Sequence, residues 1–269
     1  MFKSMGIFKF HFMYSFRLQF KNVLEGVGDY AVFFNSFFIN LFSKGFEWNE
    51  LIRQCYFIGY KSLNIVLVTG FVLGFVLTLQ SQPTFKTFGA EGYVPNMVAV
   101  SIIRELGPVI ISLICAGKIA SGIGAELGSM KVTEQIAAMD VSSANPIQYL
   151  VVTRILACIF MVPILVILAD IFAFLGGFFG TNISGNMSAI LYFNKSFESL
   201  AFSDFFPALT KTFFFGFIIG FVGCYKGFHA NKGTESVGIA ANSAVVTASF
   251  WIIIIDALAV QITSVFVYN

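Results

Sequence analysis

Residues 62–80 read SLNIVLVTGFVLGFVLTLQ and contain no charged side chain. About 20 apolar residues in a helix cross the hydrocarbon core of a bilayer, so this stretch predicts a membrane-spanning helix. The rest of the 269-residue chain has the same character, with 57% hydrophobic residues, 11% charged residues and 35 Phe. Soluble domains carry about 25% charged residues. The composition excludes an ordinary soluble protein and predicts an all-α polytopic membrane protein.

Four more stretches after residue 80 are long and apolar enough to span a bilayer. They cover residues 97–123, 147–178, 205–225 and 243–267. We therefore expect a domain of five transmembrane helices over residues 58–269. The second span contains Arg104 and Glu105.

The N-terminal region, residues 1–57, has a different pattern. Residues 7–24 place Phe8, Phe12, Phe16 and Phe20 four residues apart, with Arg17 and Lys21 on another stripe. This pattern predicts an amphipathic helix, which either lies in the membrane interface or packs on the protein's own spans. Residues 31–42 are apolar for too few positions to span, and we expect an interfacial or re-entrant continuation there.

The basic residues set the expected orientation, since Lys and Arg are retained on the cytoplasmic side. With the N-terminus inside, the outer connections hold only Lys86 and Lys195, and all other connecting basic residues fall on the inner side. We therefore expect a cytoplasmic N-terminus and a C-terminus on the opposite side.

The connection between the second and third spans, AELGSMKVTEQIAAMDVSSANP at residues 125–146, is polar. Gly128 precedes and Asn145-Pro146 follows a stretch without Gly or Pro, which predicts a short helix over residues 129–141. Val132, Ile136 and Met139 fall on one face of it. Such a helix either transmits force from a partner or is a solvated linker.

Ionisable residues within spans cost about 2.5–3.5 kcal/mol each on insertion scales, so they pair internally or border a cavity. Asp170 and Asp256 are candidate partners for Arg104, Arg154 or Lys118, and each charge is either a structural ion pair or a substrate contact. Small-residue pairs at Gly70/Gly74, Gly124/Gly128, Gly176/Gly180 and Gly216/Gly220 allow close helix approach, within the chain or between copies.

Several activities lack their residues. No HExxH motif is present, His11 and His229 fall outside the spans, and Gly117-Lys118 is followed by Ile119 rather than by Ser or Thr. We expect no metal site, no catalytic residue and no ATP-binding loop in this chain. The net charge of +2 is too small to indicate nucleic-acid binding.

Longer motifs carry a specific resemblance. They are RELGP at residues 104–108, AGK at 116–118, AELGSMKVTEQI at 125–136, NPIQYLV at 145–151, TRILA at 153–157 and GCYKGFHANKGTESVGIAANSAVV at 223–246. From about residue 50 onward the chain resembles the MlaE-type (YrbE-like) permease family, membrane subunits of ABC systems that move lipids together with MCE-domain proteins. It departs from the family at Lys118, Asn145 and Thr153, where relatives often have Arg, Asp and Pro.

The resemblance implies a homodimer whose central cavity holds a phospholipid, in the inner membrane of a Gram-negative bacterium, with an MCE-domain protein at the periplasmic mouth. It implies that helix 129–141 docks on a cytoplasmic ATP-binding subunit, which carries the ATP and Mg²⁺. The expected coupling residues are Glu126, Lys131, Val132, Glu134, Gln135 and Ile136. In the cavity we expect Leu73 and Leu77 against acyl chains, with Arg104 and Glu105 near the lipid or gating it.

The expected function is therefore ATP-driven phospholipid transport that maintains outer-membrane lipid composition. Two other functions fit the residues alone. A proton-coupled secondary transporter would use Glu105, Asp170 or Asp256 and need no ATPase. A membrane scaffold would move nothing, and changes to its span charges would alter only assembly.

Overall fold

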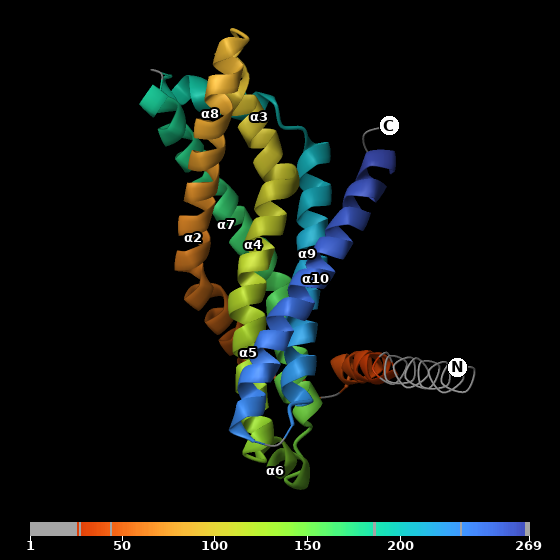
Figure 1. Ribbon diagram of the computed structural model, residues 1–269. Helices are drawn as coiled ribbons and strands as arrows, with labels where there is room; N and C mark the ends of the chain where they lie inside the picture. Colours follow the sequence, from red (N-terminus) through yellow and green to blue (C-terminus); the bar gives the residue numbers. More distant parts are fainter. Residues whose placement is uncertain (1–25, 27, 44, 185–186, 232, 267–269) are drawn as a thin grey trace, which may run out of the picture. The chain divides into compact units, whose positions relative to one another are not determined.

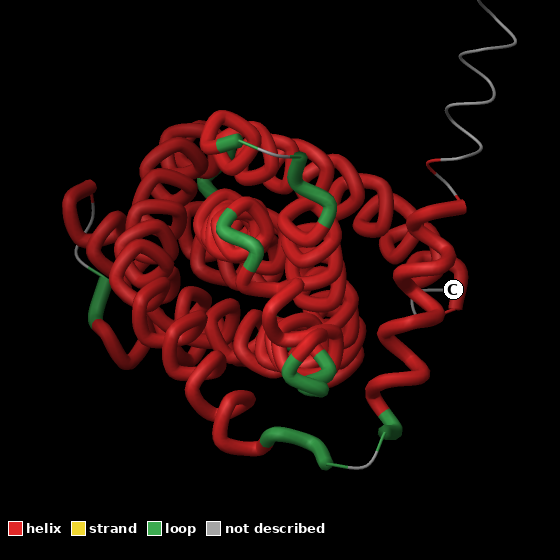
Figure 2. Tube along the Cα trace, turned by 90° about the horizontal axis from the view of Figure 1, so that it is seen from below, coloured by secondary structure: helices red, strands yellow, loops and turns green. Residues whose placement is uncertain are grey.

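The computed structural model of the chain describes residues 26, 28–43, 45–184, 187–231 and 233–266 (Figure 1). All regular structure in these residues is helical, as Figure 2 shows from one end of the bundle. The predicted all-α class is thus confirmed. The chain divides into two compact units, Met1–Phe46 and Glu47–Asn269.

The first unit contains a described helix over residues 28–41. Phe33 and Phe37 of this helix are buried, while Val32, Phe38 and Ile39 are exposed. Apolar side chains therefore surround the helix on more than one side, which suits an apolar environment. The amphipathic helix expected at residues 7–24 lies outside the described residues.

Within the described residues of the second unit, five helical segments are long and apolar enough to cross a membrane. They are Trp48–Thr87, Glu91–Val132, Ile147–Ile183, Phe202–Phe228 and Thr234–Val265. The five predicted spans are confirmed, and each helix extends beyond the predicted stretch at one end or at both. The first, α2 (Trp48–Thr87), has 40 residues and continues unbroken through residues 57 and 58, where we expected the five-span domain to begin.

The second and third spans are composed of several helical pieces. The second contains η1 (Glu91–Tyr93), α3 (Val94–Ser101), η2 (Ile102–Leu106), α4 (Gly107–Cys115), η3 (Ala116–Ala120) and α5 (Ser121–Val132). The third contains η4 (Ile147–Val152) and α7 (Thr153–Ser184), and the last two are α9 (Phe202–Phe228) and α10 (Thr234–Phe266). Short α6 (Gln135–Val141) lies at one end of the bundle and α8 (Ala189–Glu198) at the other, which we name the α6 end and the α8 end (Figure 1).

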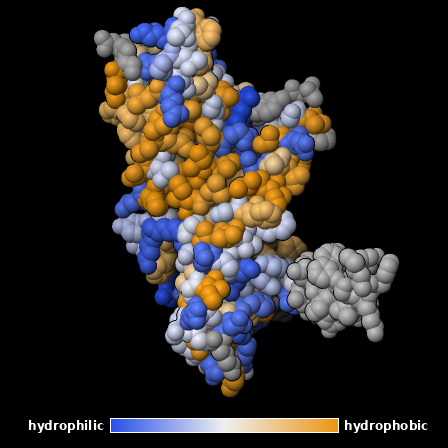
Figure 3. Space-filling view, in the orientation of Figure 1, coloured by the Kyte–Doolittle hydropathy of each residue, from blue (hydrophilic) through white to orange (hydrophobic). Residues whose placement is uncertain are grey.

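The surface agrees with a membrane position. On the face shown in Figure 3, hydrophobic residues form a broad belt, and hydrophilic residues gather toward the α6 end. Large apolar side chains such as Val68 and Val72 on α2, and Phe250 and Ile253 on α10, are exposed. Exposed large apolar side chains gathered in this way are typical of surfaces that face lipid or another protein.

Glycine permits the close contact of α2 with α7. A Cβ atom added to Gly74 would lie 1.9 Å from the carbonyl oxygen of Ala173, and one added to Gly176 would lie 2.0 Å from that of Phe71. The helix backbones approach so closely that no side chain fits between them. Gly216 approaches α7 in the same way, with the Cys158 carbonyl oxygen 2.5 Å from its Cβ position. These small-residue pairs therefore serve packing within the chain.

Three short segments of the spans, η2, η3 and η4, are π-helical. Each overlaps a motif identified in the sequence: RELGP overlaps η2, AGK overlaps η3, and NPIQYLV overlaps η4. Pro108, the second residue of α4 after η2, has no N–H, so it removes one donor from the helix hydrogen-bond ladder at this turn. Single π-helical turns inside α-helices occur frequently at functional sites.

Candidate functional site

Five charged side chains gather inside the bundle, and we name them the span charge cluster: Arg104, Glu105, Asp204, Lys211 and Asp256. The Arg104 guanidinium lies 2.7 Å from an Asp204 carboxylate oxygen. Lys211 Nζ lies 2.7 Å from Glu105 and 3.0 Å from Asp256. These contacts join η2 to the last two spans, α9 and α10.

The positions of these groups explain why they pair. Lys211 is only 6% exposed, so its ammonium group would be costly without a carboxylate beside it. Arg104 and Glu105 are neighbours in η2, yet each bonds a different residue of α9. A small cavity of about 70 Å³ adjoins the cluster and is also lined by Val260 and Thr263 of α10.

The pairing differs in part from what we expected. Arg104 binds Asp204, a residue just before the predicted fourth span, and Asp256 binds Lys211 rather than Arg104, Arg154 or Lys118. Asp170 forms no ion pair within the described residues. Asp204 and Lys211 were missed as site residues because both lie near the start of α9, where charges commonly face solvent.

Leu73 and Leu77 lie elsewhere. They are partly buried and pack against a cluster formed by Val94, Val98 and Ile102 with Ala173. The structure thus brings Arg104 and Glu105 together at one cavity, and places Leu73 and Leu77 against α3 and η2. Neither leucine lines the cavity at the charge cluster.

A larger cavity of about 450 Å³ opens near the α6 end, between α2, α5 and the start of α7. We name it the α6-end cavity. Its charged lining residues are Glu50, Arg53, Lys61, Lys118, Glu126 and Arg154. Cations outnumber carboxylates in this lining, so the cavity favours negative charge.

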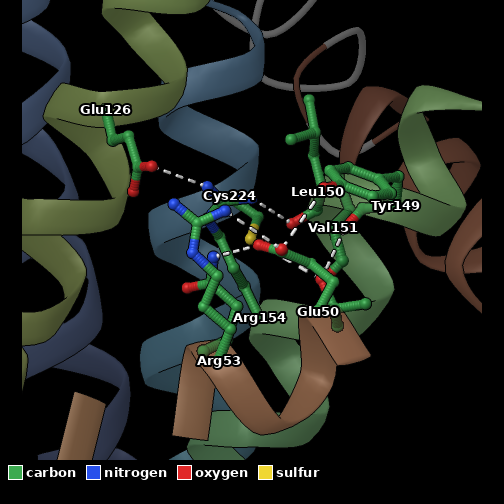
Figure 4. A network of polar contacts seen from close by, with 10 residues as sticks. Glu50, Arg53, Glu126, Tyr149, Leu150, Val151, Arg154 and Cys224 are labelled. Carbon is green, nitrogen blue, oxygen red and sulfur yellow. Dashed lines mark hydrogen bonds and ion pairs between the residues drawn. The ribbon is translucent and has the colours of Figure 1, made fainter. Parts of the chain in front are cut away.

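Arg154 organises the polar network beside this cavity (Figure 4). Its side chain is 2% exposed, one guanidinium nitrogen lies 2.9 Å from Glu126 of α5, and another donates to the Leu150 carbonyl at 2.9 Å. Glu50 accepts hydrogen bonds from Gln54 at 2.7 Å and from the Tyr149 hydroxyl at 3.3 Å. Lys118, in η3, donates to the Lys61 carbonyl of α2. The network ties three spans together next to the polar connection.

That connection is not the single helix that we expected over residues 129–141. Helix α5 ends at Val132, a turn follows, and Glu134 adopts a left-handed backbone conformation with φ of 58° before α6 begins at Gln135. The left-handed conformation interrupts the helix, although no Gly or Pro marks the position.

The expected apolar side of the connection is confirmed, since Ile136 is buried and Val132 is half-buried. Lys131, Glu134 and Gln135 are exposed. Glu126 instead turns toward Arg154, while its side chain remains 56% exposed. Three of the six expected coupling residues therefore present polar groups at the end of the molecule.

Within the described residues, no group of three or more His, Cys, Asp or Glu side chains has an arrangement that could hold a metal ion. The charge cluster and the Arg154 network both place ion pairs beside cavities inside an apolar bundle. Such sites suit the binding and movement of a charged or amphipathic molecule.

Five membrane spans and an intramembrane charge cluster define a polytopic α-helical membrane protein. Residues 51–262 match the family described as Permease MlaE, and the chain belongs to this family.

Three relatives illustrate the similarity. The chain is 37% identical over 238 residues to a protein of Rickettsia typhi named "Probable ABC transporter permease protein", covering 88% of this chain and 92% of the relative. A protein of the same description from Pyropia yezoensis is 36% identical over 208 residues, or 77% and 79% of the two chains. One from Synechocystis is 34% identical over 214 residues, or 78% and 80%.

Proposed function

We propose that this chain is the membrane subunit of an ABC transporter and that a separate ATP-binding subunit hydrolyses ATP with Mg²⁺. The names of the relatives support the proposal. The chain itself lacks the GxxxxGK[ST] phosphate-binding loop. The energy for transport then has to reach the spans through a contact between subunits.

The contact that we assign to this role is the connection from Lys131 to Ile136. Its exposed Lys131, Glu134 and Gln135 suit a polar docking surface, while buried Ile136 anchors the segment to the bundle. Glu126 lies six residues before Val132 on α5 and pairs with buried Arg154 of α7. A displacement of the connection would therefore be passed to two spans. With this assignment the α6 end faces the cytoplasm. We also propose a cytoplasmic N-terminus, as the distribution of basic residues among the connections indicates.

The cargo that we propose is a phospholipid, moved between the inner membrane of a Gram-negative bacterium and a periplasmic MCE-domain partner. The carrying observation is the span charge cluster, in which buried Lys211 and half-exposed Arg104 are held by carboxylates inside an apolar bundle. A phospholipid has a charged headgroup and apolar chains. The cluster suits the headgroup, and we assign Leu73 and Leu77, which lie on α2 outside the cavity at the cluster, to the acyl chains. Such transport would maintain the lipid composition of the outer membrane.

Two copies of the chain would form the transport path. The exposed apolar side chains of α2 and α10 provide surfaces for a second copy or for lipid. In a homodimer the two charge clusters would border one central path, with the MCE-domain protein at the α8 end.

The cargo assignment is tested with Arg104→Ala and Glu105→Ala in the reconstituted complex. We expect both variants to assemble normally and to transfer less phospholipid, because each removes one partner of an ion pair that borders the small cavity. Glu91→Ala is the matched control, since Glu91 is exposed on the same span outside the cluster. Normal transfer by both cluster variants would contradict the assignment.

The coupling assignment is tested by purifying the detergent-solubilised chain, intact and with Glu134→Lys, and identifying the proteins and lipids that accompany it. We expect the intact chain to retain an ATPase, an MCE-domain protein and phospholipid, and the variant to lose the ATPase. Glu198→Lys is the control, because Glu198 is exposed on α8 at the opposite end. Recovery of the chain alone in both forms, with transport driven by a proton gradient, would favour a secondary transporter instead.

A further inference from the structure

Among the described residues, Asp170 is the one buried carboxyl group that belongs neither to the charge cluster nor to the Arg154 network. It lies on α7 and is 9% exposed, and its Oδ1 atom has no hydrogen-bond partner. The two buried cations of the described spans, Lys211 and Arg154, form ion pairs with other carboxylates. A lone carboxylate charge in such a place is strongly disfavoured.

The neighbour of this carboxyl group is Gly107 of the RELGP motif. A Cβ atom added to Gly107 would lie 2.0 Å from Asp170 Oδ1 and 2.9 Å from the carbonyl oxygen of Ile102. The Asp170 carboxyl therefore occupies the space of a side chain at residue 107, and only glycine leaves room for it. The same point brings the carboxyl to the backbone of the π-helical turn η2.

The backbone of this turn has fewer N–H donors than carbonyl acceptors. The Gly107 N–H donates to the Ile102 carbonyl, and the next residue, Pro108, has no N–H. The chain through η2 thus offers one carbonyl more than it has backbone donors. In an apolar interior a carbonyl group without a donor is unfavourable, so a donor from a neighbouring helix would stabilise the turn.

We propose that Asp170 is held as a neutral carboxylic acid whose O–H donates to a backbone carbonyl of the η2 turn, and that it thereby positions Arg104 and Glu105. An ionised carboxylate only accepts hydrogen bonds and has no donor at this place, whereas the neutral acid supplies the donor that Pro108 removes. Asp170 is then a positioning residue that acts from α7, while the charge cluster faces α9 and α10. Its effect on transport rests on the proposed function, but its protonation and hydrogen bond do not.

The direct test compares infrared spectra of the purified full chain and of its variants, each in the same lipid at neutral pH. A neutral carboxylic acid has a C=O stretching band that is separate from the carboxylate bands. We expect this band in the unmodified protein and its loss in Asp170→Asn. Asp256→Asn is the matched control, because Asp256 lies in a span but pairs with Lys211, and the band should persist in that variant. Absence of the band from the unmodified protein, or its persistence in Asp170→Asn, would overturn the proposal.

The positioning role is tested in the reconstituted transporter. Asp170→Asn keeps a donor of the same shape and should retain lipid transfer close to that of the unmodified chain. Asp170→Leu introduces an apolar side chain of similar size that has no donor. Lipid transfer should then fall by about tenfold, the scale of one buried polar group left without its partner. Equal lipid transfer by both variants would refute the positioning role. If neither the unmodified chain nor any variant transfers lipid while the infrared result holds, the proposed cargo is wrong and the role of Asp170 in the turn stands.

Discussion

The ion pair between Arg154 and Glu126 makes an asymmetric prediction, because the two partners differ greatly in burial. Arg154 is 2% exposed and Glu126 is 56% exposed, with 2.9 Å between guanidinium and carboxylate. Removing one partner of a buried pair costs about 3–5 kcal/mol. Water reaches Glu126 and screens the pair, so we expect Glu126→Gln to lower the free energy of unfolding by about 1–2 kcal/mol.

The reverse change should be milder. Arg154→Met fills similar volume with apolar atoms and leaves the Glu126 carboxylate where water can solvate it, so the expected loss is below about 1 kcal/mol. In the double variant no buried cation remains unpaired. Its stability should match that of Arg154→Met alone, with a coupling energy between the two sites of about 1–2 kcal/mol.

The assay is reversible unfolding of the purified chain in mixed micelles as the fraction of denaturing detergent rises. Glu198→Gln, at an exposed carboxylate on α8, controls for the loss of a surface charge. If Arg154→Met destabilises the protein as much as Glu126→Gln, or if the double variant is worse than both, then burial of the Arg154 charge does not govern this network.

Three further outcomes are expected. Lys211→Met should reduce lipid transfer more than Lys211→Arg does, because only the second keeps a cation beside Glu105 and Asp256; equal losses in the transfer assay would contradict this. Gly74→Ala should lower the free energy of unfolding by about 1–3 kcal/mol, because the new methyl group would collide with the α7 backbone. Gly238→Ala should not, because a Cβ atom at that position has no other atom within 4 Å. Equal unfolding curves for the two variants would refute the packing argument. Burial raises the pKa of Tyr192 on α8 from 10.0 to about 12, so the unfolded chain loses this proton at lower pH than the native chain, and stability should fall as pH rises through that window. Tyr192→Phe should make the fall shallower in unfolding experiments at alkaline pH, and an unchanged slope would count against it.

Much of the fold follows from the sequence for a physical reason. A bilayer requires long apolar helices, so the number and place of the spans can be read from runs such as residues 62–80. The helix ends could not be read in this way, because α2 continues beyond the apolar run into residues that water or headgroups can solvate. The turn at Glu134 was also hidden, since a left-handed residue other than glycine leaves no compositional signal.

The site was predictable only in part. Arg104 and Glu105 were evident because charges within a span are costly, but their partners lie about a hundred residues away on α9. Which charges meet depends on how the helices rotate against one another, and the π-helical turn η2 changes that rotation without disturbing the apolar pattern. Pro108 in RELGP was the sequence feature that could have indicated an irregular turn at η2. The roles of Leu73, Leu77 and the coupling residues in transport remain predictions.

The central claim is that ATP hydrolysis on a partner subunit drives phospholipid through this chain. The most direct measurement follows a labelled phospholipid from vesicles that contain the purified transporter to its MCE-domain partner, with and without ATP, for the intact chain and for Glu134→Lys. We expect transfer that requires ATP and is lost in the variant, while Glu198→Lys behaves as the intact chain does. Transfer that continues without ATP and stops when the proton gradient is dissipated would contradict the account.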